Sequence, residues 1–222
     1  SSLSAACYLA KKGHKIQVLE KNDSLGGRAR QFKKDGFTFD MGPSWYWMPD
    51  VFESFFGDFG KQVSDYYQLD RLSPGYQVVF GKDDVFPVED SIAKIAARFD
   101  EIEPGSGAKL ERFLEKARNN YDIAVKDLVY RPGVSPLELV TPKTVRKVGL
   151  FFTNIRKQVD QQFKPPKLRS LLQFPVLFMG AKPESTTAFY NFMVYADFGL
   201  VTWNSKEGME QIVDGMVTLG KS

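Results

Sequence analysis

Apolar residues recur at helical spacing in several stretches of the chain and alternate with polar ones in others. The first stretch, Ser1 to Lys12, carries Leu and Ala along one face and predicts a helix. The apolar run from Ile16 to Leu19 predicts a strand that ends at the acid Glu20. After an Asp35-Gly36 turn, the alternation from Phe37 to Asp40 predicts a second strand.

The middle of the chain is predicted to be mainly helical. Its one hairpin joins two runs of alternating apolar residues through Gly81-Lys82-Asp83. Asp90 or Ser91 can cap the helix that follows, and Pro104-Gly105 ends it. The predicted elements are a phenylalanine-faced helix over 52–59, strands over 76–80 and 84–88, helices over 92–102 and 110–128 with a stop at Pro132-Gly133, a strand over 201–203 and a helix over 207–219.

A third helix is predicted to open at Thr141-Pro142. Its apolar residues, spaced three and four apart from Val145 to Val159, form a narrow seam with Lys and Arg around it. The ordinary interpretation is a helix packed on its own domain, and the alternative is a helix on an anionic membrane surface. The apolar stretch after Pro165-Pro166 favours membrane contact, because a polar substrate would need no such region.

Composition excludes several classes of site. A chain of 222 residues with a net charge of +3 can bury a core but offers no basic patch for nucleic acid. One cysteine, Cys7, and one histidine, His14, exclude an internal disulfide and a Cys- or His-rich metal site. The uncharged runs over 170–181 and 185–196 are far short of a membrane-spanning helix, which needs about 20 residues.

The residues between the two first predicted strands suit a dinucleotide. An acid at a strand end, here Glu20, can accept from ribose hydroxyls. Gly26-Gly27 lets the backbone approach a pyrophosphate, and Arg28 can neutralise it. Such a fold also needs a strand and a Gly-rich turn before the first helix, and only Ser1-Ser2 could be the last residues of that turn. The chain is therefore expected to be a fragment.

These blocks, taken in order, resemble the FAD-dependent amine oxidase superfamily, and in detail its bacterial-type phytoene desaturases. The resemblance is carried by Leu25-Gly26-Gly27-Arg28-Ala29 and by Phe39-Asp40-Met41-Gly42-Pro43-Ser44, continues through Glu103-Pro104-Gly105-Ser106-Gly107 and Tyr195-Ala196-Asp197-Phe198-Gly199-Leu200, and covers most of the chain.

The resemblance implies an α/β fold: an incomplete, doubly wound, Rossmann-like FAD-binding domain over residues 1–75 and an α+β substrate-binding, membrane-facing domain over 76–222, whose last helix returns toward the first. It implies FAD as cofactor, with Glu20 on the ribose, Gly26 and Gly27 near the pyrophosphate, Arg28 as its counter-charge, and Gly42, Pro43 and Ser44 beside the flavin. It implies an enzyme of carotenoid biosynthesis that desaturates phytoene by hydride transfer to flavin, although the fragment alone is expected to be inactive.

The end of the chain departs from the family. Val201 stands where glycine is usual, Ser205 where proline is usual, and Glu207 replaces the first glycine of a pair. A glycine there would allow a left-handed turn that Val or Glu resists.

Three questions stay open from the sequence. No catalytic residue is assigned: burial could raise the pKa of Asp197 toward a useful range, but a strand-end acid bonded to backbone is the simpler interpretation. The alternatives to a phytoene desaturase are another flavin polyene oxidoreductase, such as a retinol saturase or a carotenoid isomerase, and a non-catalytic lipid- or membrane-binding fragment. The expected partner is a long apolar isoprenoid, and the expected location is the cytoplasm, at the inner face of the membrane.

Overall fold

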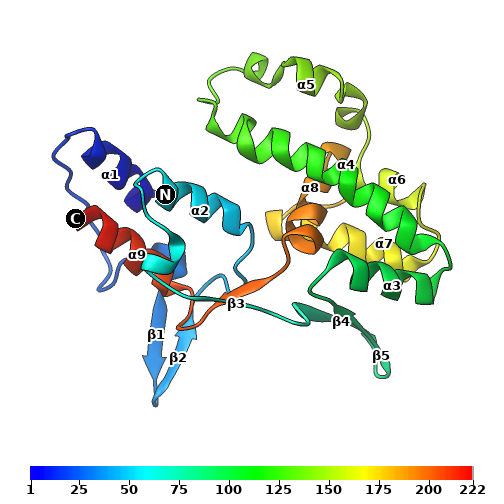
Figure 1. Cartoon of the computed structure of the whole chain (residues 1–222), viewed down its shortest axis with the longest axis horizontal. Coiled ribbons are helices and arrows are strands. Elements are labelled where there is room, and N and C mark those ends of the chain that lie inside the picture. Colours follow the sequence, from blue (N-terminus) through cyan, green and yellow to red (C-terminus); the bar gives the residue numbers. More distant parts are fainter. Residues whose placement is uncertain (222) are drawn as a thin grey trace. The chain divides into compact units, whose positions relative to one another are not determined.

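The computed structural model describes residues 1–221, and it divides them into two compact units. Unit 1 joins residues 1–71 to the C-terminal part from Trp203 onward, and unit 2 spans Leu72–Thr202 (Figure 1). The C-terminal helix thus belongs with the N-terminal residues. The assignment of a cofactor role to residues 1–75 and a substrate role to the rest stays a prediction.

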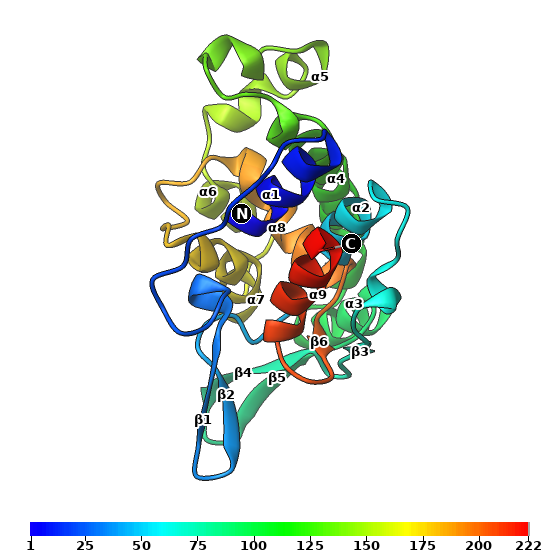
Figure 2. The ribbon, with the colours of Figure 1, turned by 90° about the vertical axis from the view of Figure 1, so that its left-hand side faces the viewer.

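Two helices from opposite ends of the chain pack together in unit 1. Helix α1 (Ser2–Lys11) lies against α9 (Glu210–Lys221), as Figures 1 and 2 both show. The buried Cys7 anchors this contact, because its thiol donates to the backbone oxygen of Met216 over 3.5 Å. Helix α2 (Pro49–Gly57) completes the core with its predicted phenylalanine face, of which Phe55 and Phe56 are buried.

The strands of unit 1 form two antiparallel pairs. Strand β1 (Gln31–Lys34) pairs with β2 (Phe37–Asp40) across the predicted turn. Asp35 and Gly36 both have positive φ there, at 52° and 83°, as a tight hairpin turn requires. Strand β3 (Leu69–Arg71) pairs with β6 (Trp203–Ser205) and ties the two ends of the unit together. The short helix η1 (Gly27–Ala29) precedes β1, and η2 (Val63–Asp65) precedes β3.

The strand predicted over Ile16–Leu19 is wrong. These residues have no regular secondary structure, and Leu19 is 82% exposed. A strand exists only where a neighbour completes its hydrogen bonds, and no partner strand lies beside this run among residues 1–221. The apolar run therefore reaches Glu20 as an irregular segment.

Unit 2 begins with the predicted hairpin and two predicted helices. Strands β4 (Tyr76–Gly81) and β5 (Asp84–Val88) pair antiparallel. Ser91 caps α3 (Ile92–Ile102), since its hydroxyl accepts from the backbone N–H of Lys94. Helix α4 (Ser106–Lys126) packs closely on α3 and ends at Lys126, six residues before the predicted stop at Pro132. Buried residues of these elements belong to a hydrophobic cluster that also includes residues between Ile155 and Phe198.

The single helix predicted from Thr141 to Val159 is wrong as well. The segment breaks into α5 (Pro142–Val145), η5 (Val148–Phe151) and α6 (Ile155–Asp160). The backbone between η5 and α6 instead bonds to 186–188, where Ile155 N–H donates to Thr186 and Ala188 N–H donates to Thr153. These bonds, and Asn154 as cap of α6, compete with a continuous helix.

The remaining elements of unit 2 are short. They are η3 (Leu128–Tyr130), η4 (Pro136–Leu139), α7 (Pro166–Gln173), η6 (Phe174–Met179), η7 (Ala188–Asn191), α8 (Phe192–Val194) and the π-helix η8 (Tyr195–Gly199).

Val201, which stands where glycine is usual in the resembling proteins, has a φ of 59°. The left-handed turn is thus kept without the glycine. A β-branched residue in this conformation costs about 1–3 kcal/mol. The buried Val201 side chain, 6% exposed, offsets this with a burial gain of about 1.5–3 kcal/mol.

Candidate functional site

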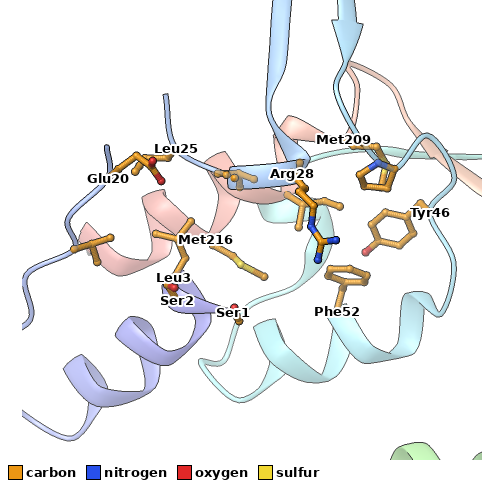
Figure 3. Close-up of a pocket in the computed structure, with 18 of the residues that line it drawn as sticks. Ser1, Ser2, Leu3, Glu20, Leu25, Arg28, Tyr46, Phe52, Met209 and Met216 are labelled. Atoms are coloured by element: carbon orange, nitrogen blue, oxygen red, sulfur yellow. The ribbon is translucent and has the colours of Figure 1, made fainter. Parts of the chain in front are cut away.

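Unit 1 contains a cavity of about 870 Å³. It opens between the N-terminal end of α1, the loop around Gly26, the segment after β2 and one face of α9 (Figure 3). Its lining residues are Ser1, Ser2, Leu3, Val18, Leu19, Glu20, Leu25, Gly26, Gly27, Arg28, Ala29, Gly42, Pro43, Trp45, Tyr46, Trp47, Phe52, Met209, Ile212, Val213 and Met216.

The glycines of the cavity permit close packing of three segments. Gly26 has a φ of 103°, and a Cβ there would lie 3.0 Å from the side chain of Val213 on α9. A Cβ on Gly42 would lie 1.9 Å from the backbone oxygen of Arg28, a distance that no side chain tolerates. Gly42 therefore lets the chain after β2 touch the loop that carries Arg28.

Arg28 provides the positive charge of the cavity. Its side chain is exposed, and its guanidinium makes no hydrogen bond or ion pair with any other residue in 1–221. In Figure 3 the guanidinium extends from the loop toward the rings of Tyr46 and Phe52. A planar cation with unused donors is a suitable partner for a phosphate or carboxylate.

Glu20 lies at another part of the cavity wall, near Leu25 and apart from Arg28 (Figure 3). Its Oε1 accepts from the backbone N–H of Asn22 over 2.9 Å and from the Asn22 side-chain amide over 2.6 Å. The backbone bond from Asn22 is the main cause that lowers the pKa of Glu20, so this acid is a carboxylate at neutral pH. Its Oε2 is left as an acceptor for a hydroxyl of a ligand.

The N-terminal end of α1 borders the same cavity through Ser1, Ser2 and Leu3. No side chain caps this end and its first turn contains no acid. The amide groups at a helix N-terminus carry a partial positive charge and favour an anion. Together with Arg28, they make one side of the cavity suited to negative charge.

Aromatic rings line the part of the cavity that Arg28 faces. Tyr46 is 1% exposed, and its hydroxyl shares a 3.0 Å hydrogen bond with that of Tyr67. Burial raises the pKa of Tyr67 to about 12 and that of Tyr46 further, so both phenols stay neutral. Trp45 and Trp47, whose ring centroids lie 5.7 Å apart, and Phe52 extend this apolar wall.

The structure brings most of the predicted site residues to one place. Ser2, Glu20, Gly26, Gly27, Arg28, Gly42 and Pro43 line the cavity, and Ser44 does not. The predicted site residues did not include Met209, which precedes α9, or Ile212, Val213 and Met216 of α9, although the resemblance implied that the last helix returns toward the first domain. Their helical spacing indicated only an inward face, and no local signal says which surface that face meets.

Asp197 does not line the cavity. It is 1% exposed within η8, not at a strand end as predicted, and Tyr76 donates to its Oδ2 over 2.5 Å. Its Oδ1 has no hydrogen-bond partner within the described part of the chain. Burial raises the pKa of Asp197 to about 7, although the Tyr76 hydroxyl opposes this rise. The favoured interpretation, a strand-end acid bonded to backbone, is therefore wrong, and the structure agrees with the alternative of a buried acid with a raised pKa.

Residues 1–221 contain neither a metal-binding cluster nor a membrane-spanning helix. No group of three His, Cys, Asp or Glu side chains in that range is arranged to hold a metal ion. None of the helices in the same range combines the length and apolar character needed to cross a bilayer.

Comparison with known proteins gives one consistent family. Residues 3–222 match the family model described as flavin-containing amine oxidoreductase. The chain is 42% identical to a carotenoid 3,4-desaturase of Haloarcula japonica, over 99% of the chain and 45% of that protein. It is 33% identical to a 4,4'-diapophytoene desaturase of Staphylococcus haemolyticus, over 100% of the chain and 44% of that protein. The chain thus spans less than half the length of these relatives.

Solved structures agree on the fold. A putrescine oxidase variant superposes with a TM-score of 0.56 at 17% identity, covering 97% of this chain and 46% of that one. A protein of Pyrococcus furiosus superposes with a TM-score of 0.58 at 14% identity, covering 99% and 46%. At these identities the likeness concerns the fold alone, and it supports the predicted α/β class.

Proposed function

Because the chain belongs to the flavin-containing amine oxidoreductase family, we propose that the protein containing it binds FAD and desaturates a carotenoid. The observation that carries the proposal is the cavity of unit 1, where an unpaired Arg28 and a helix N-terminus adjoin an aromatic wall. The identity to a carotenoid 3,4-desaturase and to a diapophytoene desaturase supports the class of substrate.

The residues of the cavity fit a dinucleotide. Arg28 and the N-terminal end of α1 would hold the pyrophosphate, and Gly26-Gly27 would let the backbone approach it. Glu20, kept ionised by its bonds from Asn22, would accept from ribose hydroxyls. Gly42 and Pro43 line the cavity together with Tyr46, and they would lie beside the flavin ring. Ser44 is assigned no contact.

Desaturation removes two hydrogens from neighbouring carbons, one as a hydride and one as a proton, and leaves a double bond. A bound flavin supplies the acceptor for the hydride, which no side chain can replace. The apolar wall around Trp45 and Trp47 would exclude water from the reacting carbons. Asp197 is buried in unit 2 and does not line the cavity, and we assign it no part in the proton transfer.

Phytoene is the first substrate to test, since the names of both relatives indicate a long apolar polyene as substrate. Such a substrate dissolves in a bilayer, and we propose that the protein works as a peripheral protein on the inner face of the membrane, reached from the cytoplasm. The apolar side chains exposed in unit 2 support this part of the proposal.

To test the proposal, the protein that contains this chain is expressed in cells that accumulate phytoene. Chromatography and absorption spectra then identify the pigments. We expect coloured products that are lost in Glu20→Ala and in Arg28→Ala. Lys33→Ala, which removes an exposed charge from β1 outside the cavity, is the control and should keep activity.

Two outcomes separate the parts of the proposal. A purified protein that carries FAD but leaves phytoene unchanged would reject this substrate and keep the cofactor. The alternative polyene reactions, saturation or isomerisation, would then be tested with other carotenoids. A protein that binds no FAD would reject the whole proposal and leave a non-catalytic lipid-binding role.

A further inference from the structure

The segment from Leu128 to Phe152 in unit 2 exposes most of its apolar side chains. We call it the 128–152 surface; it is the part of unit 2 that contains α5 in Figure 1. Val134 is 85% exposed, Leu137 76% and Phe152 87%. Isolated exposed apolar residues are ordinary, but a concentration within 25 consecutive residues indicates an interaction site.

Many backbone groups of this surface are hydrogen-bonded within it. The carboxylate of Glu138 accepts from the backbone N–H groups of Gly133, Val134 and Ser135 over 2.8, 2.9 and 3.1 Å. Thr141 and Thr144 cap α5 reciprocally, and both are buried. These backbone and capping groups are thus hydrogen-bonded, while the apolar side chains of Val134, Leu137 and Phe152 are exposed. Entry into an apolar medium requires this arrangement, because unpaired backbone groups there cost several kcal/mol each.

The charges of the surface that remain available to a partner are positive. Its only acid is Glu138, which the backbone N–H groups already hold. Arg131 pairs with Asp127 over 2.9 Å, which neutralises it. Lys143 and Arg146 are exposed and form no ion pair with other residues in 1–221. Free cations beside apolar side chains match an anionic bilayer, and they would repel a second copy of the same surface.

We propose that the 128–152 surface docks on an anionic phospholipid bilayer, with Val134, Leu137 and Phe152 in the acyl boundary and Lys143 and Arg146 on the headgroups. The inference deepens the proposed function and rests on its membrane contact. It does not depend on flavin or on desaturation, and both tests below read binding alone.

The first test places a fluorescent probe at the surface. Cys7 is the only cysteine and is buried, so Phe152→Cys in a Cys7→Ser background gives one reactive thiol. An environment-sensitive dye there should shift its emission to the blue with vesicles of phosphatidylcholine and phosphatidylglycerol. Val79→Cys, at a 68% exposed position on β4, is the matched control and should not shift. Equal shifts at both positions would overturn the proposal.

The second test removes the charges and follows flotation with the same vesicles. We expect Lys143→Gln with Arg146→Gln to weaken binding about 25-fold, at about five-fold for each cation near an anionic surface. Arg112→Gln with Lys116→Gln makes the same charge change on the exposed side of α4 and should bind as the parent does.

The results distinguish the two levels of the inference. A parent protein that does not float overturns membrane contact itself. A parent that floats while both double variants float equally overturns only this surface. Loss of self-association in Phe152→Ser without lipid would assign the surface to a second copy instead. A probe on Phe152→Cys that reacts only after unfolding would assign it to another part of the protein.

Discussion

At the scale of single residues, the cavity depends on the contact between Gly42 and the loop that carries Arg28. A methyl group at Gly42 would lie 1.9 Å from the Arg28 backbone oxygen, so Gly42→Ala must push the loop away. We expect flavin affinity to fall at least about ten-fold, since about 1.4 kcal/mol of lost contact suffices for that change. Fluorescence quenching on titration with FAD measures it.

Gly57→Ala is the matched control, because nothing lies within 4 Å of a Cβ at that position in α2. It should leave flavin affinity unchanged. Equal affinities of Gly42→Ala and the parent protein would show that the close approach has no role in the cavity.

Asp197 makes the stability of unit 2 depend on pH. Its pKa is raised to about 7 in the folded chain, whereas in the unfolded chain it has its ordinary value near 3.8. Below the lower pKa, Asp197 is protonated in both the folded and the unfolded state, so the free energy of unfolding is not reduced. As pH rises from about 4 to 7, the unfolded state ionises first, and the free energy of unfolding falls by up to about 4 kcal/mol.

Asp197→Asn should remove this dependence. As pH rises, the free energy of unfolding of the variant should increase relative to that of the parent protein. The difference should be complete above about pH 7, where Asp197 is ionised in both the folded and the unfolded parent. Urea unfolding at several pH values measures it. Asp122→Asn, at a partly exposed acid on α4 whose side chain pairs with Lys126, should follow the parent at every pH. A constant difference between Asp197→Asn and the parent would contradict the buried-acid explanation.

At the scale of elements, the sequence pattern correctly predicted the turns, hairpins and caps that depend on contacts between neighbouring residues. The β1–β2 turn, the β4–β5 hairpin and the cap of α3 lie close to their predicted places, because Asp35-Gly36, the 76–88 alternation and Ser91 act on neighbouring residues. The strand at Ile16–Leu19 and the helix from Thr141 failed for a non-local reason. The Ile16–Leu19 run lacks a neighbouring strand within residues 1–221. The segment after Thr141 forms backbone hydrogen bonds with residues 186–188 instead of continuing as a helix.

Asn154 tests the second explanation. Its Oδ1 accepts from the backbone N–H of Lys157 over 2.8 Å and so starts α6 where the longer helix was predicted to continue. Asn154→Ala should cost about 1 kcal/mol in the free energy of unfolding, the usual value of a lost N-cap. Asn119→Ala, at an exposed position inside α4, should be neutral or slightly stabilising. A stabilised Asn154→Ala would show that the cap opposes a more favourable continuous helix.

At the scale of the whole molecule, the cavity could be predicted only in part. Glu20, Gly26, Gly27 and Arg28 are near in sequence, and the chemistry of their side chains and backbone is enough to indicate one common ligand. The apolar residues of α9 come about 190 positions later, and only the packing of α9 on α1 adds them to the same wall. Since hydrophobic packing is not directional, the sequence pattern shows that a face is buried but not against what.

Because the cavity combines residues from both ends of the chain, we predict that a bound flavin protects both regions from hydrogen exchange. Every residue of the cavity belongs to unit 1, from both of its chain segments. Binding at 100 times the dissociation constant stabilises the bound state by about 2.7 kcal/mol, which slows the local opening that exposes amides to exchange by about 100-fold. With FAD present, we expect slower hydrogen exchange in α1, η1 and α9 and unchanged exchange in α4 of unit 2. Adenosine alone, without a pyrophosphate, is the control and should protect little. Protection confined to α4 would place the ligand in unit 2 and reject the cavity, whereas protection of α1 without α9 would leave the ligand on the Gly26 loop and reject the α9 wall.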